Sequence, residues 1–149
     1  MSRDVSTELD ELRANNLGRL LLGAFRRYHR AALEAVQAKG HADLTMAHAQ
    51  ILPHIARQGS RLTEIAAAAD MTKQSASELI ASLEALGYLR READPADRRA
   101  RRVMFTRKGQ TFLRHVFEAQ QALRDEIKDK MGERNAQQLV RLLERYLAP

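Results

Sequence analysis

The chain contains no cysteine, and this absence excludes several kinds of chemistry at once. Without a thiol, the chain can hold no disulfide, no thiolate zinc site and no thiol-based peroxide sensor. Aromatic residues are also scarce, at 5% of the sequence. We therefore expect a hydrophobic core built mainly from Leu, Ala, Ile and Val, which the overall hydrophobic content of 44% can supply.

Long apolar runs are missing as well. No stretch approaches the roughly 18–20 consecutive apolar residues that a membrane-spanning helix needs. The first eleven residues lack the apolar segment of a secretory signal, so we expect a cytoplasmic protein of bacterial type. With 149 residues, of which 30% are charged, the chain suits one domain, or one domain with an appended helical part.

The motifs of common enzymes are absent from the sequence. There is no glycine-rich phosphate loop, no Gly-x-Ser-x-Gly and no His-Glu-x-x-His. Ser75 and Ser77 have no neighbouring His or Asp pattern that would activate a nucleophile. The five histidines contain no His-x-x-x-His pair, and His48 and His54 fall on different faces of a helix, so we predict no metal site and no cofactor. We therefore expect a protein that is not an enzyme.

Positive charge, in contrast, is concentrated in one segment. Between Tyr88 and Lys108 there are eight basic residues and three acidic ones, a surplus of five out of the net charge of +6. A solvated surface normally mixes both signs, whereas a focused basic segment attracts a polyanion. This distribution favours a nucleic-acid partner.

The pattern before this segment predicts helices. Apolar residues at spacings of three, four and seven predict a long helix from about Thr7 to Ala38, ended by Gly40. A helix of this length with a wide apolar stripe is expected to pack against a second chain; the alternative is an ordinary core helix. Thr45 is expected to cap a helix from Met46 to Arg57, which Pro53 should kink or break.

Two short helices and a turn come next. Arg61 and Leu62 could form a short strand, Thr63 is expected to begin a helix that ends at Ala69, and Asp70 and Met71 form a turn. Thr72 is a good N-cap for a second helix that Gly87 ends. Its inward residues are Leu79, Ile80, Leu83 and Leu86. Its N-terminal outward residues are Thr72, Lys73, Gln74, Ser75, Ser77 and Glu78, a set of polar side chains able to reach bases and phosphates.

The basic segment itself reads as a two-stranded ribbon. Residues 88–91 and 101–105 are the expected strands, and Asp94-Pro95 is a turn initiator in the connection between them. Arg98 and Arg99 lie near the tip, where a guanidinium can enter a minor groove or contact the DNA backbone, and Arg101 follows. Asp97 would repel phosphate, so we expect it to pair with an arginine and fix its direction.

Helix, turn, capped helix and basic ribbon together resemble the winged helix-turn-helix of the MarR (multiple antibiotic resistance regulator) family. The ribbon carries Asp-Pro-Ala-Asp-Arg-Arg followed by Val-Met-Phe-Thr-Arg-Lys-Gly, which is similar to the family's wing signature, with Phe105 in place of the usual Leu. The resemblance implies that Arg99 is the wing-tip contact and Asp97 its support. It covers nearly the whole chain and is strongest from Leu62 to Gly109.

The resemblance also implies a fold and an assembly. The fold class is mainly α with a small β-wing: one MarR-like domain, 1–149, with a winged helix-turn-helix lobe at 41–107. Residues 6–40 and 108–149 form an α-helical dimerisation region, in which Thr106 caps a long helix and Gly132 separates it from a final one. A homodimer of this kind places two recognition helices about 34–36 Å apart and predicts a pseudo-palindromic operator.

Members of the family often bind small aromatic or lipophilic anions in a crevice between the helices and the lobe. The candidate pocket residues here are Phe25, Tyr28, His29, His48 and Leu52, with Arg26 as a candidate counter-ion, although ordinary packing is the favoured explanation for each of them taken singly. The expected function is a DNA-binding transcriptional regulator, most often a repressor, associated with the nucleoid. The alternative is a helical interaction protein, or a non-specific nucleic-acid binder, that uses the basic ribbon.

Overall fold

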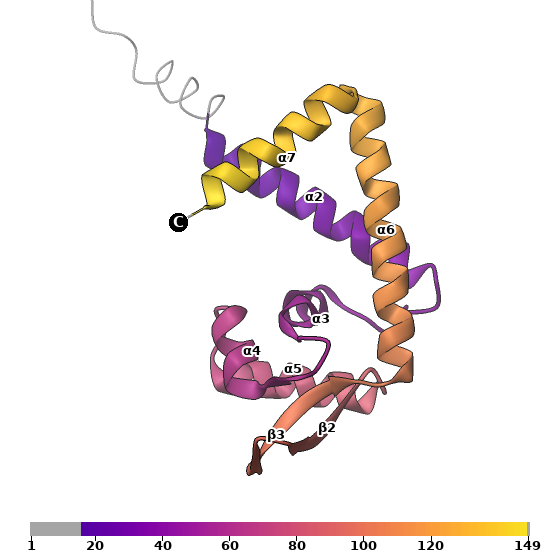
Figure 1. The fold of residues 1–149 in the computed structure, drawn as a ribbon. Helices are drawn as coiled ribbons and strands as arrows, with labels where there is room; N and C mark the ends of the chain where they lie inside the picture. Colours follow the sequence, from indigo (N-terminus) through magenta and orange to yellow (C-terminus); the bar gives the residue numbers. More distant parts are fainter. Residues whose placement is uncertain (1–15, 149) are drawn as a thin grey trace, which may run out of the picture.

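The structure is a computed structural model that describes residues 16–148, with helices and one small sheet arranged in two regions (Figure 1). One region is the lobe, residues 41–107, and the other is the helical region, which comprises the described residues 16–40 and 108–148. The fold is mainly helical with a small antiparallel sheet, as the sequence predicted. No helix within residues 16–148 is long and apolar enough to span a membrane.

The helical region consists of three helices. Helix α2 (Leu17–Gln37) packs on α6 (Arg107–Met131), and α7 (Glu133–Leu147) follows α6 after the break at Gly132. Asn16 caps α2, and the expected start of this helix near Thr7 lies outside the described residues. The helix ends at Gln37, and Gly40, which has a φ of +96°, follows in the turn rather than directly at the helix end.

The lobe begins with a helix shorter than predicted. Helix α3 (Met46–Ile51) is capped by Thr45 and then tightens into a 3-10 turn, η1 (Leu52–His54), because Pro53 has no N–H to continue the α-helical pattern. Strand β1 (Ser60–Arg61) is the predicted short strand, displaced by one residue. Helix α4 (Leu62–Ala68) follows it directly. The predicted start at Thr63 is wrong, since Arg61 is the N-cap and its backbone N–H donates to Glu64 Oε2 (2.8 Å).

Helix α5 (Lys73–Ala85) and the two-stranded wing complete the lobe. Strands β2 (Leu89–Asp94) and β3 (Asp97–Phe105) are longer than predicted and leave a two-residue turn. The sheet order is β1-β3-β2, and both pairings are antiparallel. Gly87 ends α5 as predicted. It has a φ of +79°, and the N–H of Tyr88 closes the helix end on the carbonyl of Leu83 (2.9 Å).

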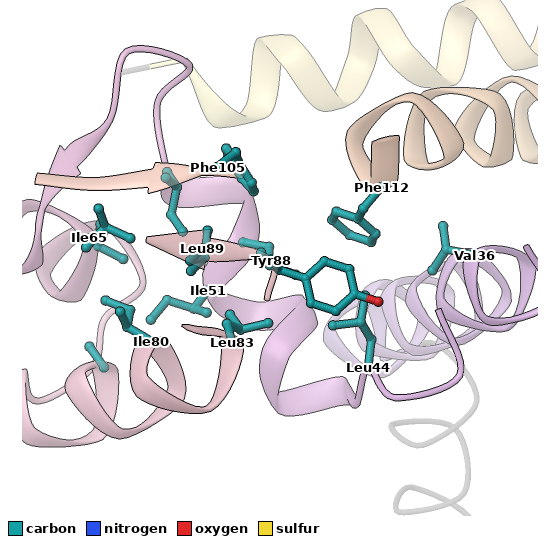
Figure 2. Packing of buried hydrophobic residues seen from close by; sticks show 14 of the residues in the cluster. Val36, Leu44, Ile51, Ile65, Ile80, Leu83, Tyr88, Leu89, Phe105 and Phe112 are labelled. Carbon is teal, nitrogen blue, oxygen red and sulfur yellow. The ribbon is translucent and has the colours of Figure 1, made fainter. Parts of the chain in front are cut away.

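The hydrophobic core lies within the lobe and reaches the base of the long helices. Ile51, Ile65, Ile80 and Leu83 have no exposed surface, and Leu89 and Phe105 close the core from the sheet side (Figure 2). Val36 of α2 and Phe112 of α6 join the same cluster around Tyr88. The three helices of the lobe and the first turns of α6 therefore share one core.

A polar chain of contacts fastens the lobe to α6 beside that core. The buried Tyr88 hydroxyl donates to Asp43 Oδ1 (2.6 Å) and lies 2.9 Å from His41 Nδ1, while His41 Nε2 lies 2.9 Å from Nδ1 of His115 on α6. Lys108 Nζ donates to Asp43 Oδ2 (2.9 Å) and lies 4.1 Å from the centre of the Tyr88 ring. The junction between the two regions is thus tied by side-chain hydrogen bonds as well as by apolar packing.

Candidate nucleic-acid interface

The turn between α4 and α5 fixes how the second helix starts. Asp70 adopts a φ of +52°, in the left-handed region that Asp tolerates better than most residues, and the N–H of Met71 reaches back to the carbonyl of Ala66 (2.9 Å). Thr72 then caps α5, since its Oγ1 accepts from the N–H of Ser75 (3.1 Å). The predicted cap is confirmed, and it leaves the N-terminal end of α5 open to solvent.

The first two turns of α5 present most of the predicted recognition residues on one face. Thr72, Lys73, Gln74, Ser75 and Glu78 are exposed, whereas Ser77 is half-buried and therefore less available. The opposite face carries Ala76, Ile80 and Leu83, which are buried in the core. Because the apolar side anchors the helix, its polar side is held outward.

One contact within that face restricts the conformation of a side chain. The amide of Gln74 donates to Glu78 Oε1 (3.2 Å) one turn later, while Lys73 has no such neighbour among the contacts of the described residues. The exposed face of α5 therefore combines the Gln74 amide, whose direction is restricted, with the ammonium group of Lys73, which is not held by a neighbour among the described residues. Amide and ammonium groups are the donors that reach base edges and phosphates in a major groove.

The wing is a ribbon with a tight, self-bonded tip. Asp94 Oδ1 accepts from the N–H of Ala96 (2.9 Å), which is the Asx turn that Asp-Pro predicted, and the pairing shifts register between Ala93 and Asp94. Arg99 and Arg101 are exposed on β3. The backbone of Arg98 belongs to the same strand, but its side chain lies outside the described part of the structure.

The nearly buried carboxylate of this wing is Asp94, and it is bound to an arginine of β1. Its Oδ2 accepts from Arg61 Nε (2.7 Å), and the Asp94 side chain is only 5% exposed. Asp97, the predicted partner of an arginine side chain, instead accepts from the backbone N–H of Arg99 (3.0 Å). The bond from Ala96 and the Arg61 guanidinium lower the pKa of Asp94. No local sequence pattern indicates the bond between Arg61 and Asp94, because the two residues are 33 positions apart.

The five candidate pocket residues lie on α2, α3 and η1 and differ in exposure. A groove of about 570 Å³ runs beside α5, and of these five only His48 lines it; its other lining residues are Asp70, Met71, Thr72, Ser75, Glu78, Leu79 and Ser82. Leu52 is buried in the core. Phe25 is 59% exposed on α2 and stacks on His29, with ring centroids 5.0 Å apart. A ligand crevice formed by these residues therefore stays a prediction.

Three histidines serve as hydrogen-bonding groups within the lobe and at its junction, namely His41, His48 and His115. His48 accepts from the N–H of Thr45 through Nδ1 (3.2 Å), and its Nε2 lies 3.0 Å from Ser82 Oγ. His41 and His115 contact each other, as described above. Within residues 16–148, no group of three or more His, Asp or Glu side chains is arranged to hold a metal ion.

Comparison with known proteins relates the lobe to a known family. Residues 42–100 match the model of the MarR family. The transcriptional regulator Tm0710 from Thermotoga maritima is 26% identical, with 88% of this chain and 91% of that chain covered and a TM-score of 0.62. No curated protein sequence matches the chain.

Two other solved structures share the fold at lower identity. Wild-type MarR from E. coli in its apo form is 21% identical, covers 89% of this chain and 97% of its own, and has a TM-score of 0.72. Bordetella bronchiseptica BpsR, whose DNA binding is regulated by 6-hydroxynicotinic acid, is 21% identical, with 90% and 100% coverage and a TM-score of 0.68. The arrangement of lobe and long helices is that of these regulators.

Proposed function

We propose that this chain, a MarR-family transcriptional regulator, binds a pseudo-palindromic DNA operator as a homodimer and represses transcription from it. Regulators of this family are non-enzymatic, and the chain is not an enzyme. The observation that carries the proposal is the pairing, on one lobe, of the outward polar face of α5 with a basic ribbon. The nucleoid would be its place of action.

Each element has a separate role in this proposal. The start of α5 enters a major groove, where Lys73 and Gln74 reach base edges while Thr72, Ser75, Ser77 and Glu78 shape the surface around them. The wing follows the backbone into the neighbouring minor groove through Arg98, Arg99 and Arg101. Asp97 supports Arg99 through its carboxylate, which accepts from the backbone N–H of Arg99 and not from the Arg99 guanidinium.

Exposed apolar surface on the helical region supports a homodimer. The large exposed apolar side chains of α2 and α7 are Leu17, Leu20, Leu21, Leu22, Phe25, Leu139, Val140, Leu142, Leu143 and Leu147. Contiguous apolar surface of this kind usually marks a protein interface. A second copy packed on these helices would cover it, and the symmetric pair would present two α5 helices to successive turns of DNA.

We further propose that a small aromatic or lipophilic ligand releases the dimer from DNA. Release requires only that the ligand prefers a lobe spacing that does not fit B-DNA, and a coupling of about 1–3 kcal/mol changes affinity by roughly 5–150-fold. The ligand-regulated DNA binding of BpsR is a precedent within the same fold. Phe25, Tyr28, His29, His48 and Leu52 remain the residues to vary first, one at a time.

The first test is a selection of genomic fragments with the purified protein, followed by anisotropy titrations of the enriched fragment against a scrambled duplex of equal length. A specific regulator should bind the enriched inverted repeat at least roughly 10³-fold more tightly than scrambled DNA. Equal affinity for both duplexes would instead leave a non-specific binder that uses its basic ribbon. Capture of an acidic protein without DNA binding would favour the interaction-protein alternative.

Gln74→Ala tests the assignment of α5 with a close control. Loss of a base contact should cost about 1–3 kcal/mol on the operator and relax specificity at one base pair, with little change on scrambled DNA. Gln137→Ala is the matched control. The amide of Gln137 donates to Glu133 Oε1 one helical turn away (2.6 Å), as Gln74 does to Glu78, but both residues lie on α7. Equal effects of the two substitutions would contradict the assignment of α5.

A further inference from the structure

The outer face of the sheet brings two arginines together at the base of the wing. Arg61 of β1 lies directly opposite Arg102 of β3 in the antiparallel register, and their neighbours Ser60 and Val103 face the buried side. Side chains directly opposite each other on neighbouring strands have Cβ atoms about 4.5–5.5 Å apart, and like charges at such positions destabilise a sheet. This pair therefore needs an anion.

Within the protein, one carboxylate, that of Asp94, bonds one of the two arginines, Arg61. Asp94 is nearly buried and bonds Arg61 through Nε, which raises the pKa of Arg61 and keeps it charged. The bond uses one edge of the guanidinium. Arg61 remains 39% exposed, and no further hydrogen bond of its side chain is present among the described residues. Its two Nη groups are thus available to a second acceptor.

Arg102 is less well satisfied than Arg61. Its Nε is buried without a hydrogen-bond partner among the described residues, and no described carboxylate forms an ion pair with it. Its positive charge does contribute to the lowered pKa of Asp94. One carboxylate is thus shared electrostatically by two guanidinium groups, one of which it bonds.

The remaining carboxylates around the pair are already engaged. Glu92 lies opposite Arg102 on β2 but is bound to Arg90 (2.7 Å). Glu64 accepts from the backbone N–H of Arg61, and Asp97 accepts from that of Arg99. Arg102 and the Nη groups of Arg61 therefore have no carboxylate bonded to them among the described residues, although acidic residues are close.

We infer that Arg61 and Arg102 form a phosphate-binding pair for the DNA backbone, and that Asp94 is the positioning residue that directs Arg61. A guanidinium binds phosphate oxygens through paired N–H groups, which suits the free edge of Arg61. The location fits a backbone contact, because β1 leads directly into α4 and pairs with β3 of the wing. Such contacts fix register and carry no sequence information.

The inference rests on the proposed function, and salt dependence separates it from a structural role. Loss of one phosphate contact should reduce the slope of log affinity against log salt by about 0.9. We expect this reduction for Arg61→Ala and for Arg102→Ala, with equal weakening on the enriched fragment and on scrambled DNA. Arg27→Ala is the matched control, since it removes an arginine ion-paired with Glu126 on the helical region (3.0 Å). An unchanged slope for both wing variants would overturn the inference.

Asp94→Asn tests the positioning role by the sign of its effect. The substitution adds one positive charge to the wing, so electrostatics alone predicts tighter binding to DNA. If Asp94 directs Arg61, binding should weaken instead, while the amide oxygen can still accept from Ala96 and keep the turn. Tighter binding would contradict the positioning role.

A second variant covers the case in which Asp94→Asn does not fold. Arg61→Lys keeps the charge but lacks the Nε bond, so it should retain the salt slope and lose affinity. If the Arg61→Lys variant binds DNA as tightly as the wild-type protein, the claim that Asp94 directs the Arg61 guanidinium is contradicted. The salt slope and the affinity can both be measured on scrambled DNA. A wild-type protein that binds all DNA with equal affinity would contradict the operator proposal, and the phosphate-binding pair could still be tested. A wild-type protein that binds no DNA would end both.

Discussion

The lobe and the helical region bury apolar surface in different ways. In the lobe, α3, α4, α5 and the sheet enclose a shared core, and several of its aliphatic side chains have no exposed surface. In α7, Ala136 is the single buried residue, while Leu142 is 52% and Leu147 is 76% exposed. The lobe satisfies its own packing within one chain. The helical region carries an apolar surface whose partner must come from outside, and this difference is what we expect mutation to reveal.

The largest expected effect is in the lobe core. Ile80→Ala removes a side chain with no exposed surface and should lower the free energy of unfolding by about 2–5 kcal/mol. Since the missing contacts are within one chain, the loss should be the same at low and high protein concentration in urea denaturation. A loss that disappears at high concentration would contradict a self-contained lobe.

The junction between the regions should give the next largest effect. A Cβ at Gly109, in the first turn of α6, would collide with the carbonyl oxygen of Tyr88 and approach Phe105 Cδ1 to 2.9 Å. Backbone cannot rotate away as a side chain can, so Gly109→Ala should cost about 1–3 kcal/mol of stability through overpacking. Gly23→Ala is the control, because no atom lies within 4 Å of a Cβ there. Equal melting temperatures would indicate that α6 moves freely on the lobe.

A substitution in α7 should affect association more than folding of the lobe. Leu142→Ala is expected to raise the dimer dissociation constant roughly tenfold, which corresponds to about 1.4 kcal/mol. Sedimentation equilibrium measures this change, with Gln137→Ala on the same helix as control. An unchanged dimer dissociation constant would show that Leu142 is not in the interface. A monomeric wild-type protein would contradict the view that the helical region packs against a second chain.

Acid should weaken the lobe before it weakens the helical region. Burial lowers the pKa of His41 and of His48 below the ordinary value of 6.5, and the neighbouring His115 adds to the effect on His41. The folded lobe therefore binds fewer protons than the unfolded chain. Its stability should be complete above pH 6.5 and should fall as the pH drops from there through the folded pKa values.

The carboxylates of the helical region respond at lower pH. The pKa of Glu118 is lowered by its bond to Lys39, and that of Glu126 by its bonds to Lys130 and Arg27. Their contribution is present above the ordinary value of 4.5 and is lost only below it. Urea midpoints at pH 7.5, 6 and 4 should thus show the first loss between the two higher values, reduced in His48→Gln. No change in that interval would contradict the histidine assignment.

Local patterns in the sequence predicted what local chemistry decides. Thr45, Thr72 and Thr106 are caps as expected, because a hydroxyl next to an open helix start binds the N–H groups three residues on. Pro53 ended α3, and Asp94-Pro95 began the wing turn. The extents of α3 and of the strands and the start of α4 were wrong. The strands are longer because pairing across the sheet continues the ribbon beyond its alternating pattern.

Contacts between distant segments were beyond the sequence. The bond from Arg61 to Asp94 depends on how β1 and β2 lie across β3. The chain from His115 to Asp43 depends on how α6 meets the turn before α3. Asp97 was expected to bind an arginine side chain because its charge opposed its surroundings, yet Asp94 is the buried acid. The charge pattern indicated that an acidic residue of the wing binds an arginine side chain. The fold determines that Asp94 makes such a bond, to Arg61.

The position of Tyr88 gives the protein optical reporters for both regions. The chain has no tryptophan and three tyrosines, so tyrosine dominates its intrinsic fluorescence. Tyr88 has no exposed surface and is bonded to a carboxylate, whereas Tyr28 and Tyr146 are exposed on α2 and α7. A soluble quencher such as iodide should reach the latter two and not Tyr88. Association of the helices should then reduce quenching, and opening of the lobe should increase it, without any added dye.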